Sequence, residues 1–559
     1  MLARALRLWR TVRWLKPVQV LARLWHILHT PSVSEKALPQ RADFTERGVP
    51  SEWVLPARRK PSMLGPVEFQ FLNETNTLEV CGWDEPSVAK LWRYNLHYFD
   101  DLNAHESAAR KEWHQALVGR WITENPPFEG SGWEPYPTSL RIVNWIKWAL
   151  SGHADLSSEF ERSLALQARW LRKRLEHHLL GNHLFVNAKA LIFAGVWFGD
   201  SPEGREWFRV GERILEKQIP EQFLKDGGQF ERSPMYHALG LEDLLDLLNV
   251  CRAFSRCEFV RNSRVLSEAA LRPRISRALN FLEHVSFADG RLAHFNDSAA
   301  GVSPDNAELM RYSGELGVAG SAEQPGLAAR KVRSALESGY VRISDEQFEA
   351  IVDVAPIGPD YLPGHAHADT LSFESYFRGL PLIVNSGTSE YGLGEERLRQ
   401  RGTAAHSTVC VDGQNSSEVW SGFRVARRAR PIGLDVRESA DEVVVACGHD
   451  GYCRLSGSPV HKRRWRLSSA GLEVEDRIDG NFDKAVAHFH LHPDVKVSQQ
   501  TARVFQLQCG DECLEMRVHT GCAELLDSSY HPEFGLVQRS QQIAVQLEGN
   551  HSRVQFVPT

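Results

Sequence analysis

The sequence predicts an α+β protein of several domains, in which an N-terminal (α/α) toroid of helical hairpins precedes a C-terminal antiparallel β-sandwich. Its 559 residues are too many for one hydrophobic core, since single cores stop growing at about 250–300 residues. Apolar residues recur at helical spacing through the first half of the chain, which predicts amphipathic helices. Short runs with a period of two follow in the second half, which is typical of antiparallel strands.

Residues 1–65 are predicted to form a basic N-terminal arm and a linker. The arm carries six arginine or lysine side chains before its first acid, Glu35, and apolar residues such as Leu2 and Trp9 fall near helical spacing. Charges interrupt the apolar residues and Pro17 breaks the run, so neither a signal peptide nor a transmembrane span is expected. Such a segment lies on an anionic membrane surface, docks on the protein's own body or binds a partner.

Residues 66–335 are predicted to form the toroid. Apolar side chains recur with i, i+3, i+4 spacing in residues 139–150, 158–179 and 239–255. Clusters of Pro and Gly separate these segments. A series of amphipathic helices without a fixed-period repeat favours helical hairpins over a solenoid.

Residues 336–559 are predicted to form the β-sandwich. Residues 338–356 alternate between apolar and polar side chains and are rich in β-branched types. Similar short runs continue to the end of the sequence, separated by Gly, Asp, Asn and Ser. Many short alternating strands with turn residues between them indicate two packed antiparallel sheets.

Composition excludes several classes of function. The net charge of −6 provides no strong field for nucleic acid, so no nucleic-acid partner is expected. Nine cysteines without a CxxC pair suggest neither a disulfide scaffold nor a cysteine zinc site. Nucleotide-binding loops and the G-x-S-x-G and HExxH motifs do not occur in the sequence.

Two polar clusters stand out in the helical half. Asn182, His183 and Asn187 come just before an apolar segment that is predicted as a helix from Ala188; helix capping explains one such asparagine but not all three residues. Tyr236 and His237 lie near the start of a further helix. A tyrosine becomes an acid–base catalyst when nearby cations lower its pKa, and His237 and Arg232 are the local candidates.

The β half contains a third cluster, Gly364-His365-Ala366-His367-Ala368-Asp369. If this stretch is extended, His365, His367 and Asp369 point to one side, because side chains alternate along a strand. The arrangement predicts an active-site wall or a metal site, against the alternative of a hydrogen-bonded polar face. The later run from His488 to His492 has the same spacing but no carboxylate, which favours a structural role.

These motifs together resemble the heparinase II/III-like family of polysaccharide lyases. The likeness runs from about Trp92 to His492 and is most specific in GHAHAD-x-LSF, in the NSGT turn at 385–388 and in the HSTV stretch at 406–409. It implies a toroid followed by antiparallel sheets, with a cleft between them for an anionic, uronic-acid-containing polysaccharide. The implied reaction is β-elimination, in which the C5 proton is removed and the C4–O bond breaks.

The resemblance also implies roles for single residues. Asn182, assisted by His183, neutralises the uronate carboxylate; Tyr236 donates to the leaving oxygen and takes the proton; His365 is the base for one sugar epimer. The predicted substrate-binding residues are Trp133, Tyr136, Arg141, Asn187, Arg232, His237, Tyr391 and Arg401.

A structural zinc ion is the one metal that the resemblance implies, and the chemistry itself requires no cofactor. The family's zinc positions match His367, Asn385 and His406. Asn385 stands where the family usually has Asp, and a neutral amide is a poorer zinc ligand than a carboxylate. The alternatives are a site completed by Asp369 or a network of hydrogen bonds.

Two other functions and the location stay open at this point. The alternatives to a lyase are a C5-epimerase-like enzyme and a non-catalytic glycan-binding protein of polysaccharide biosynthesis. The basic arm resembles that of family members associated with exopolysaccharide or capsule production. With no visible signal peptide, this favours the cytoplasm or the inner membrane surface, with the periplasm as the alternative.

Overall fold

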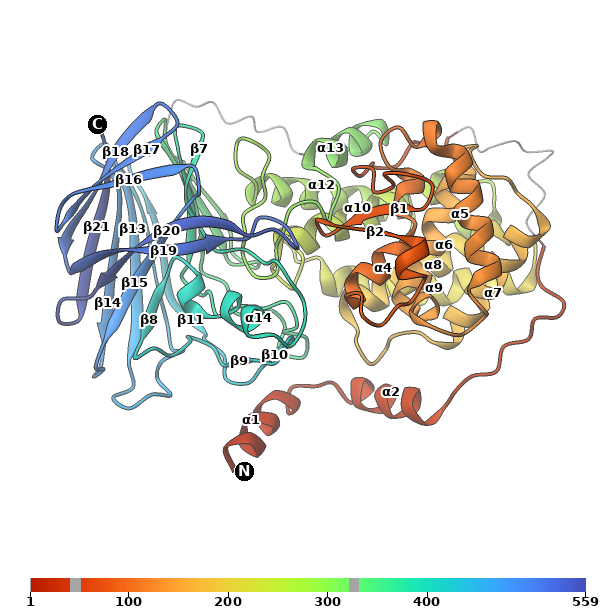
Figure 1. Ribbon diagram of the computed structural model, residues 1–559, viewed down its shortest axis with the longest axis horizontal. Coiled ribbons are helices and arrows are strands. Elements are labelled where there is room, and N and C mark those ends of the chain that lie inside the picture. Colours follow the sequence, from red (N-terminus) through yellow and green to blue (C-terminus); the bar gives the residue numbers. More distant parts are fainter. Residues whose placement is uncertain (1, 41–51, 321–330) are drawn as a thin grey trace.

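The computed structural model describes residues 2–40, 52–320 and 331–559. Figure 1 shows helices gathered in the N-terminal part of the chain and antiparallel sheets in the C-terminal part. The predicted α+β order is therefore confirmed, whereas closure of the helices into a toroid stays a prediction. Among the helices of the described ranges, none combines the length and hydropathy that a bilayer-spanning helix needs.

Three central helices position the site: α6 (Pro135–Leu150), α8 (Gly181–Trp197) and α10 (Pro234–Ala253). α6 and α10 begin with a proline, whose missing N–H is not needed in the first turn. They overlap the predicted segments 139–150 and 239–255, and the predicted segment 158–179 stops being helical at Lys173. The other helices are α1 (Leu2–Val12), α2 (Pro17–Leu28), α3 (Leu78–Cys81), α4 (Lys90–Tyr98), α5 (Lys111–Glu124), α7 (Ser158–Lys173), α9 (Pro202–Gln222), α11 (Glu258–Arg261), α12 (Glu268–His284), α13 (Asn306–Glu315) and α14 (Glu395–Gln400), with short 3-10 turns at Asp100–Asn103, Ser107–Arg110, Ser131–Trp133 and Thr403–Ala405.

Tryptophan side chains fill the core of the helical body, which comprises helices α3 to α13. Trp121 and Trp145 meet edge to face at 5.6 Å, and Phe99 packs against both rings. Aromatic pairs of this geometry stabilise a core beyond the area that they bury. The high tryptophan content of the sequence is thus largely explained by the core, since six tryptophans of this body are among its largest fully buried side chains: Trp92, Trp121, Trp145, Trp148, Trp197 and Trp207.

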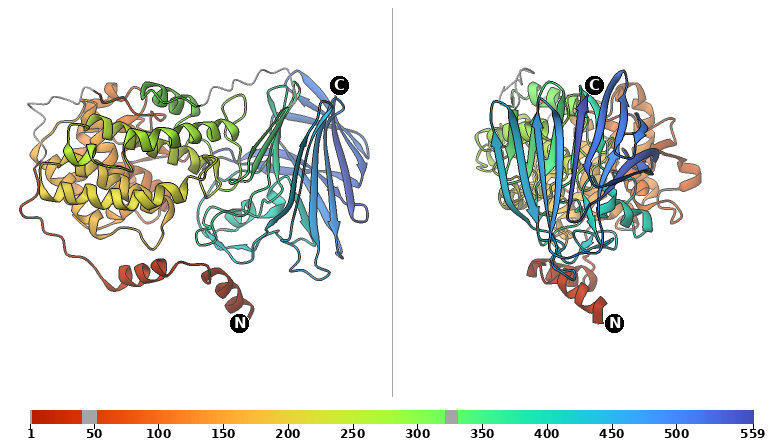
Figure 2. Two further views of the ribbon diagram at one scale, coloured as in Figure 1. Left: turned by 180° about the vertical axis from the view of Figure 1, so that it is seen from behind. Right: turned by 90° about the vertical axis from the view of Figure 1, so that its left-hand side faces the viewer.

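Two antiparallel sheets make up the C-terminal half (Figure 2). Their inner faces share one hydrophobic core. Phe373 of the first sheet meets Trp465 of the second, and Phe489 meets Phe556. The first sheet has the order β19-β20-β15-β7-β6-β5-β4-β3 with β8 beside β15, and the second has the order β11-β12-β13-β14-β21-β18-β17-β16. The strands are β3 (Lys331–Ala335), β4 (Tyr340–Ser344), β5 (Phe348–Asp353), β6 (Phe373–Phe377), β7 (Leu380–Val384), β8 (Val409–Val411), β11 (Pro431–Glu438), β12 (Glu442–His449), β13 (Val460–Ser468), β14 (Gly471–Asp479), β15 (Ala485–Leu491), β16 (Val495–Thr501), β17 (Val504–Cys509), β18 (Glu512–Thr520), β19 (Cys522–Tyr530), β20 (Gln538–Gln546) and β21 (His551–Pro558).

Two small hairpins lie outside these sheets. β1 (Glu68–Phe71) pairs with β2 (Glu74–Thr77) inside the predominantly helical half, and β9 (Val419–Trp420) pairs with β10 (Arg424–Val425). Strands this short give almost no periodic signal, so the sequence did not predict the first hairpin.

Hydrogen bonds join the helical body to the sheets next to the site. The backbone N–H of Asp297 donates to the carbonyl of His365 at 2.9 Å. The Tyr340 hydroxyl of β4 donates to the carbonyl of Arg232 at 2.6 Å, and Asp226 accepts from the backbone N–H of Ser338 at 2.8 Å. These contacts fix the positions of residues from both halves around one cavity.

Candidate active site

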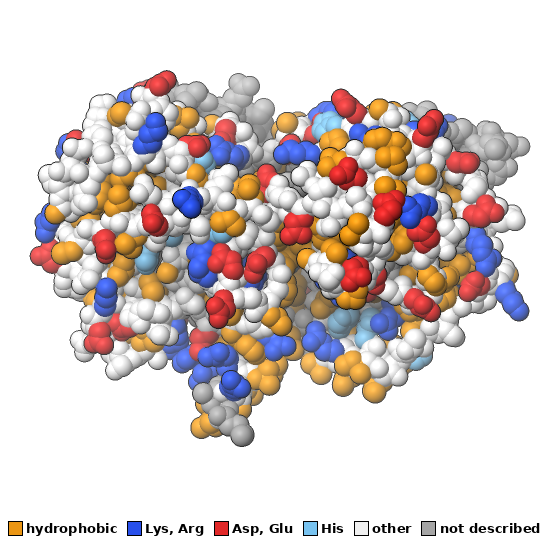
Figure 3. Space-filling model, in the orientation of Figure 1, with side chains coloured by type: hydrophobic (Ala, Val, Ile, Leu, Met, Phe, Trp, Pro, Cys, Tyr) orange, Lys and Arg blue, Asp and Glu red, His pale blue; other side chains and the backbone are white. Residues whose placement is uncertain are grey.

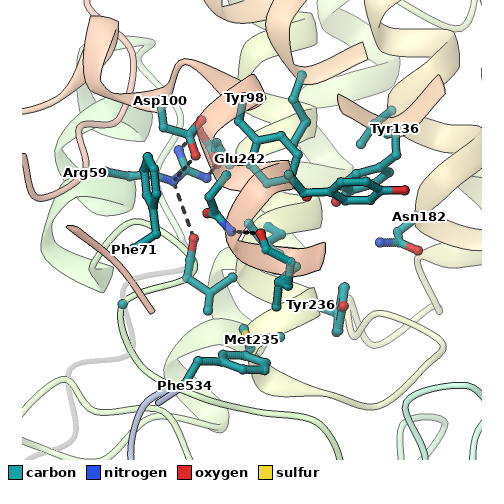
Figure 4. A pocket seen from close by; sticks show the side chains of 18 of the residues that line it. Arg59, Phe71, Tyr98, Asp100, Tyr136, Asn182, Met235, Tyr236, Glu242 and Phe534 are labelled. Atoms are coloured by element: carbon teal, nitrogen blue, oxygen red, sulfur yellow. Dashed lines mark hydrogen bonds and ion pairs between the residues drawn. The ribbon is translucent and has the colours of Figure 1, made fainter. Parts of the chain in front are cut away.

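A cavity of about 670 Å³ lies where the helical body meets the loops of the C-terminal half. Figure 4 shows Tyr136, Asn182 and Tyr236 at one end of it, with Arg59, Asp100 and Glu242 at the other. The cavity gathers six of the residues predicted for the site: Tyr136, Asn182, His183, Tyr236, His365 and Tyr391.

Asn182 and His183 stand in the first turn of α8. The helix begins at Gly181, so the predicted start at Ala188 is wrong, and capping does not explain Asn182, because the N-cap position is Leu180. Gly181 has a φ of +54°, and a Cβ there would come within 2.3 Å of a Leu362 methyl. Glycine is required at this position because the loop of Leu362 presses against the start of the helix.

A buried carboxylate orients His183. Glu176 accepts a hydrogen bond from Nδ1 of His183 at 3.1 Å and one from Nδ2 of Asn187 at 3.0 Å. Burial disfavours the charged imidazolium, but the Glu176 carboxylate outweighs burial and raises the pKa of His183. Asn187 is fully buried and does not line the cavity, since its amide is occupied by Glu176 and the Ser139 hydroxyl. We interpret Asn187 as a residue that positions Glu176.

Tyr236 is held near the start of α10, whose N-cap Ser233 accepts from the Tyr236 backbone N–H at 3.1 Å. Its ring lies 3.9 Å from the His365 ring, centroid to centroid, and its hydroxyl is 3.2 Å from the Tyr391 hydroxyl. Burial raises the pKa of Tyr236 well above its ordinary value. The expectation that His237 and Arg232 lower this pKa is therefore wrong, and the phenol is protonated at neutral pH.

His365, His367 and Asp369 lie in an irregular loop, because β6 begins only at Phe373. The expected extended strand is thus wrong, yet all three residues converge on the segment Asn296–Asp297. Asp369 accepts from the backbone N–H of Asn296 at 3.0 Å. The convergence comes from the loop wrapping around this segment and not from alternation along a strand.

Asp297 is the centre of this cluster, and no motif in the sequence singles it out. Its carboxylate meets Nδ1 of His365 at 3.0 Å and Nε2 of His367 at 2.8 Å, and it pairs with both terminal nitrogens of Arg397. Burial opposes its ionised form, but Arg397 holds the pKa of Asp297 well below its usual range. An ionised carboxylate can only accept, so Nδ1 of His365 carries the proton and Nε2 is left as an acceptor.

A second buried carboxyl, Glu231, stands beside the same imidazole. Its Oε2 lies 3.8 Å from Nε2 of His365. Burial raises the pKa of Glu231, while His365 and His183 act in the opposite direction. Glu231 is thus a buried titratable group that interacts with both histidines of the cavity.

The far end of the cavity is lined by ion pairs. Arg59 donates to both oxygens of Glu242, at 2.7 and 2.9 Å. Lys147 lies 2.5 Å from Asp246, and Lys189 lies 2.7 Å from Asp243. These three cations are paired with carboxylates, whereas Lys60, which also lines the cavity, is exposed.

Two predicted substrate-binding residues are buried in the helical core. Trp133 is 3% exposed and packs 5.6 Å from the Trp121 ring. Arg141 stacks over the same indole at 3.8 Å, and its Nε donates to Gln167. Neither side chain lines the cavity, because the aromatic core of this body surrounds both.

Three further predicted binding residues also point away from the cavity. Arg232 donates to the carbonyls of Ser338 and Glu337. His237 is fully buried, and its Nε2 contacts the carbonyl of Ala278 at 2.9 Å. Arg401 is fully buried and donates to backbone carbonyls of the C-terminal half. All three side chains bind backbone carbonyls, whereas the sequence predicted that they would bind the substrate.

The residues at the predicted zinc position do not fit a zinc site. Nδ1 of His367 lies 3.2 Å from Nε2 of His406, and the Asn385 side-chain oxygen accepts from the backbone N–H of Ser407. Across the described ranges, no three His, Cys, Asp or Glu side chains cluster closely enough to hold a metal ion. Two imidazoles and an occupied neutral amide are a poor donor set for zinc, and Asp369 is engaged by Asn296. We therefore derive no step through a metal.

Comparison with known proteins assigns this architecture. Residues 94–312 match the heparinase II/III N-terminus, and residues 328–556 match the heparinase II/III-like C-terminal domain. The chain belongs to the heparinase II/III-like family. Its fold is that of the crystal structure of heparinase III, with a TM-score of 0.68 at 16% identity, over 97% of this chain and 89% of that chain.

Two curated relatives of this heparinase II/III-like protein differ in how much they match. A heparin-sulfate lyase of Pedobacter heparinus is 29% identical over 272 residues, which are 46% of this chain and 40% of that protein. FtsZ-localized protein C of Caulobacter vibrioides is 25% identical over 501 residues, which are 83% of this chain and 81% of that protein. The match to the lyase thus spans well under two thirds of that protein's length.

Proposed function

We propose that this protein is a polysaccharide lyase that cleaves a uronic-acid-containing glycan by β-elimination, in a cleft between an (α/α) toroid and a β-sandwich. The observation that carries the proposal is the meeting of Asn182, Tyr236 and His365 in one cavity, with the last two rings in contact. Membership of the heparinase II/III-like family and the likeness to heparin-sulfate lyases support it.

The first requirement is to neutralise the uronate carboxylate, because C5–H is hardly acidic beside a full negative charge. The Asn182 amide donates hydrogen bonds to the carboxylate. His183, whose pKa is raised by Glu176, carries a positive charge to higher pH than an ordinary histidine does. Donors that are held in place before the charge develops stabilise it without reorganisation. Tyr136, whose ring lies 4.5 Å from that of His183, closes this side of the subsite.

Elimination then needs a base and an acid. Nε2 of His365 accepts the C5 proton, because Asp297 holds the proton on Nδ1. The C5–H electron pair forms the C4=C5 double bond as the C4–O bond breaks. Tyr236 is protonated at neutral pH and donates its proton to the leaving oxygen. The products are an unsaturated uronate and a new free hydroxyl; Tyr236 is reprotonated and His365 deprotonated through solvent.

The charges that line the cavity favour a uronate polymer with few sulfates. Of the five lysine and arginine side chains that line the cavity, four pair with a carboxylate and Lys60 is exposed. The pairs are Arg59 with Glu242, Lys90 with Glu134, Lys147 with Asp246 and Lys189 with Asp243. A site for sulfate groups requires arginine or lysine side chains that are free to pair with the ligand. Because most cations of the lining are already paired, it supports a substrate whose charge is mainly its carboxylates.

The deciding experiment follows ultraviolet absorbance during incubation with uronate polymers of low and high sulfation. Rising absorbance from the conjugated double bond, strongest on the least sulfated polymer and lost in Tyr236→Phe, is the expected result. Equal rates on heavily sulfated chains would contradict the substrate class. Absence of product on every uronate polymer that the protein binds would contradict the lyase itself.

The alternative is a C5-epimerase-like enzyme or a non-catalytic glycan-binding protein. The non-catalytic alternative is supported by the Caulobacter vibrioides relative, which matches 83% of this chain and whose name gives localisation with FtsZ and no reaction. Exchange of solvent deuterium into C5 without a double bond would indicate the epimerase. Binding with neither exchange nor cleavage would indicate the binding protein.

A further inference from the structure

The N-terminal arm, defined here as residues Leu2–Leu28 with helices α1 and α2, packs on the rest of the protein in an unusual orientation. Figures 1 and 2 show it running along one side of the molecule, below both the helical body and the sheets. Trp420 of β9 donates to the Thr11 hydroxyl at 3.1 Å, and Lys16 pairs with Glu221 of α9. The arm therefore touches both halves of the protein through polar contacts.

α2 turns its polar side toward the body. Gln19 is 4% exposed, and its amide donates to the carbonyl of Tyr361 at 3.3 Å. About two turns further along the same face, His26 contacts the carbonyl of Leu175 at 3.1 Å. An amphipathic helix on a globular protein normally buries its apolar side, so this orientation is the reverse of the common one.

The apolar side of α2 consequently faces away from the protein, and the large apolar side chains of α1 are exposed as well. Trp9 is 56% exposed, Leu21 66%, Trp25 60% and Leu28 82%. Thirteen of the twenty-three exposed large hydrophobic side chains in the described ranges belong to Leu2–Leu28. So large a concentration of exposed apolar area marks an interaction surface.

The charge of the arm indicates what kind of partner this surface binds. The arm carries six basic residues and no acid, whereas the rest of the chain has 59 basic residues (65 − 6) against 71 acidic ones. Figure 3 shows basic and apolar side chains together on the lower projection of the molecule. Exposed tryptophans flanked by arginines are typical of helices that lie in the interface of an anionic bilayer.

We propose that the arm docks this protein on an anionic membrane surface, with α1 and α2 lying in the interface plane. Leu21, Trp25 and Leu28 enter the acyl boundary, and Arg4, Arg7 and Arg13 meet the lipid headgroups. A second copy of the chain is a poorer partner, because symmetric pairing of two arms places like charges together. The catalytic cavity plays no part in this proposal, so the two can fail separately.

Vesicle flotation of the full-length protein tests the proposal. The expected result is binding to phosphatidylcholine vesicles that contain phosphatidylglycerol, little binding to pure phosphatidylcholine, and release by high salt. Each basic residue near such a surface strengthens binding about fivefold, so Arg4→Gln with Arg7→Gln is expected to weaken it roughly 25-fold. Trp9→Glu with Trp25→Glu is expected to abolish flotation.

A matched control separates the arm from general effects of added charge. Val80→Glu with Val537→Glu replaces two side chains that are 79% and 62% exposed on the body, and this variant is expected to float like the wild type. Flotation of the Trp9/Trp25 variant at wild-type level would overturn the proposal. So would a wild type that does not float but sediments as a dimer which this variant dissociates, because that outcome assigns the arm to a second copy.

Discussion

The Asp297 carboxylate accepts a hydrogen bond from Nδ1 of His365 across 3.0 Å. Asp297 lies between α12 and α13 of the helical body, whereas His365 lies in the loop before β6. The contact therefore joins the two halves of the protein at the cavity, and it fixes which imidazole nitrogen is left to accept a proton.

Asp297→Asn is expected to lower kcat about 10²–10³-fold with little change in KM, since the amide no longer favours the tautomer with the proton on Nδ1. The pH profile of kcat should change as well, which a merely structural effect on folding would not produce. His367→Gln removes a different bond to the same carboxylate, at 2.8 Å. If this control loses as much activity as Asp297→Asn at equal thermal stability, the tautomer argument is wrong.

Tyr236→Phe is expected to reduce elimination by about 10²–10⁴-fold, because it removes the proton donor to the leaving oxygen. The ring and its contact with His365 remain, so substrate binding and thermal unfolding should be unchanged. Tyr391→Phe is the matched control, because its hydroxyl lies 3.2 Å from that of Tyr236. A larger loss in Tyr391→Phe than in Tyr236→Phe would exchange the roles of the two tyrosines.

Glu176→Gln is expected to shift the alkaline limb of kcat/KM to lower pH. The Glu176 carboxylate raises the pKa of His183 despite burial, so its removal lets the imidazolium lose its proton earlier. Steady-state kinetics across neutral pH would show KM rising more than kcat falls. Ser139→Ala, which removes a hydrogen bond of Asn187 without changing a charge, should leave the limb in place; an equal shift there would contradict the electrostatic explanation.

Glu374→Gln is expected to stabilise the protein at alkaline pH. Burial raises the pKa of Glu374 from 4.5 to about 7, so the folded state keeps a proton that the unfolded chain has already lost. The free energy of unfolding therefore falls as pH rises from about 4.5, and the loss is complete above about 7. It reaches roughly 3 kcal/mol. Denaturant unfolding at mildly acidic and alkaline pH measures the difference in free energy of unfolding between the wild type and the variant. Glu438→Gln on exposed β11 should show no such trend; an identical response in both variants would exclude Glu374 as the source.

Local signals in the sequence were enough to locate several parts of the site. The motif at 364–369, the Asn182-His183 pair and Tyr236 each stood out as polar groups next to apolar segments, and the cavity gathers His365, His183 and Tyr236. Arg141, Arg232 and Arg401 were wrongly expected to be free for the substrate, because other groups of the protein accept their hydrogen bonds. A sequence does not show which carbonyl or ring a guanidinium meets.

The sequence by itself determined the α+β order, the family resemblance and the basic amphipathic arm, because periodicity, motif spacing and charge are properties of neighbouring residues. Only the tertiary structure revealed that Asp297 orients His365, that carboxylates pair with most cations of the cavity, and that α2 presents its apolar side outward. Each of these depends on contacts between residues far apart in the chain, where burial and the approach of a distant charge set protonation, pairing and exposure.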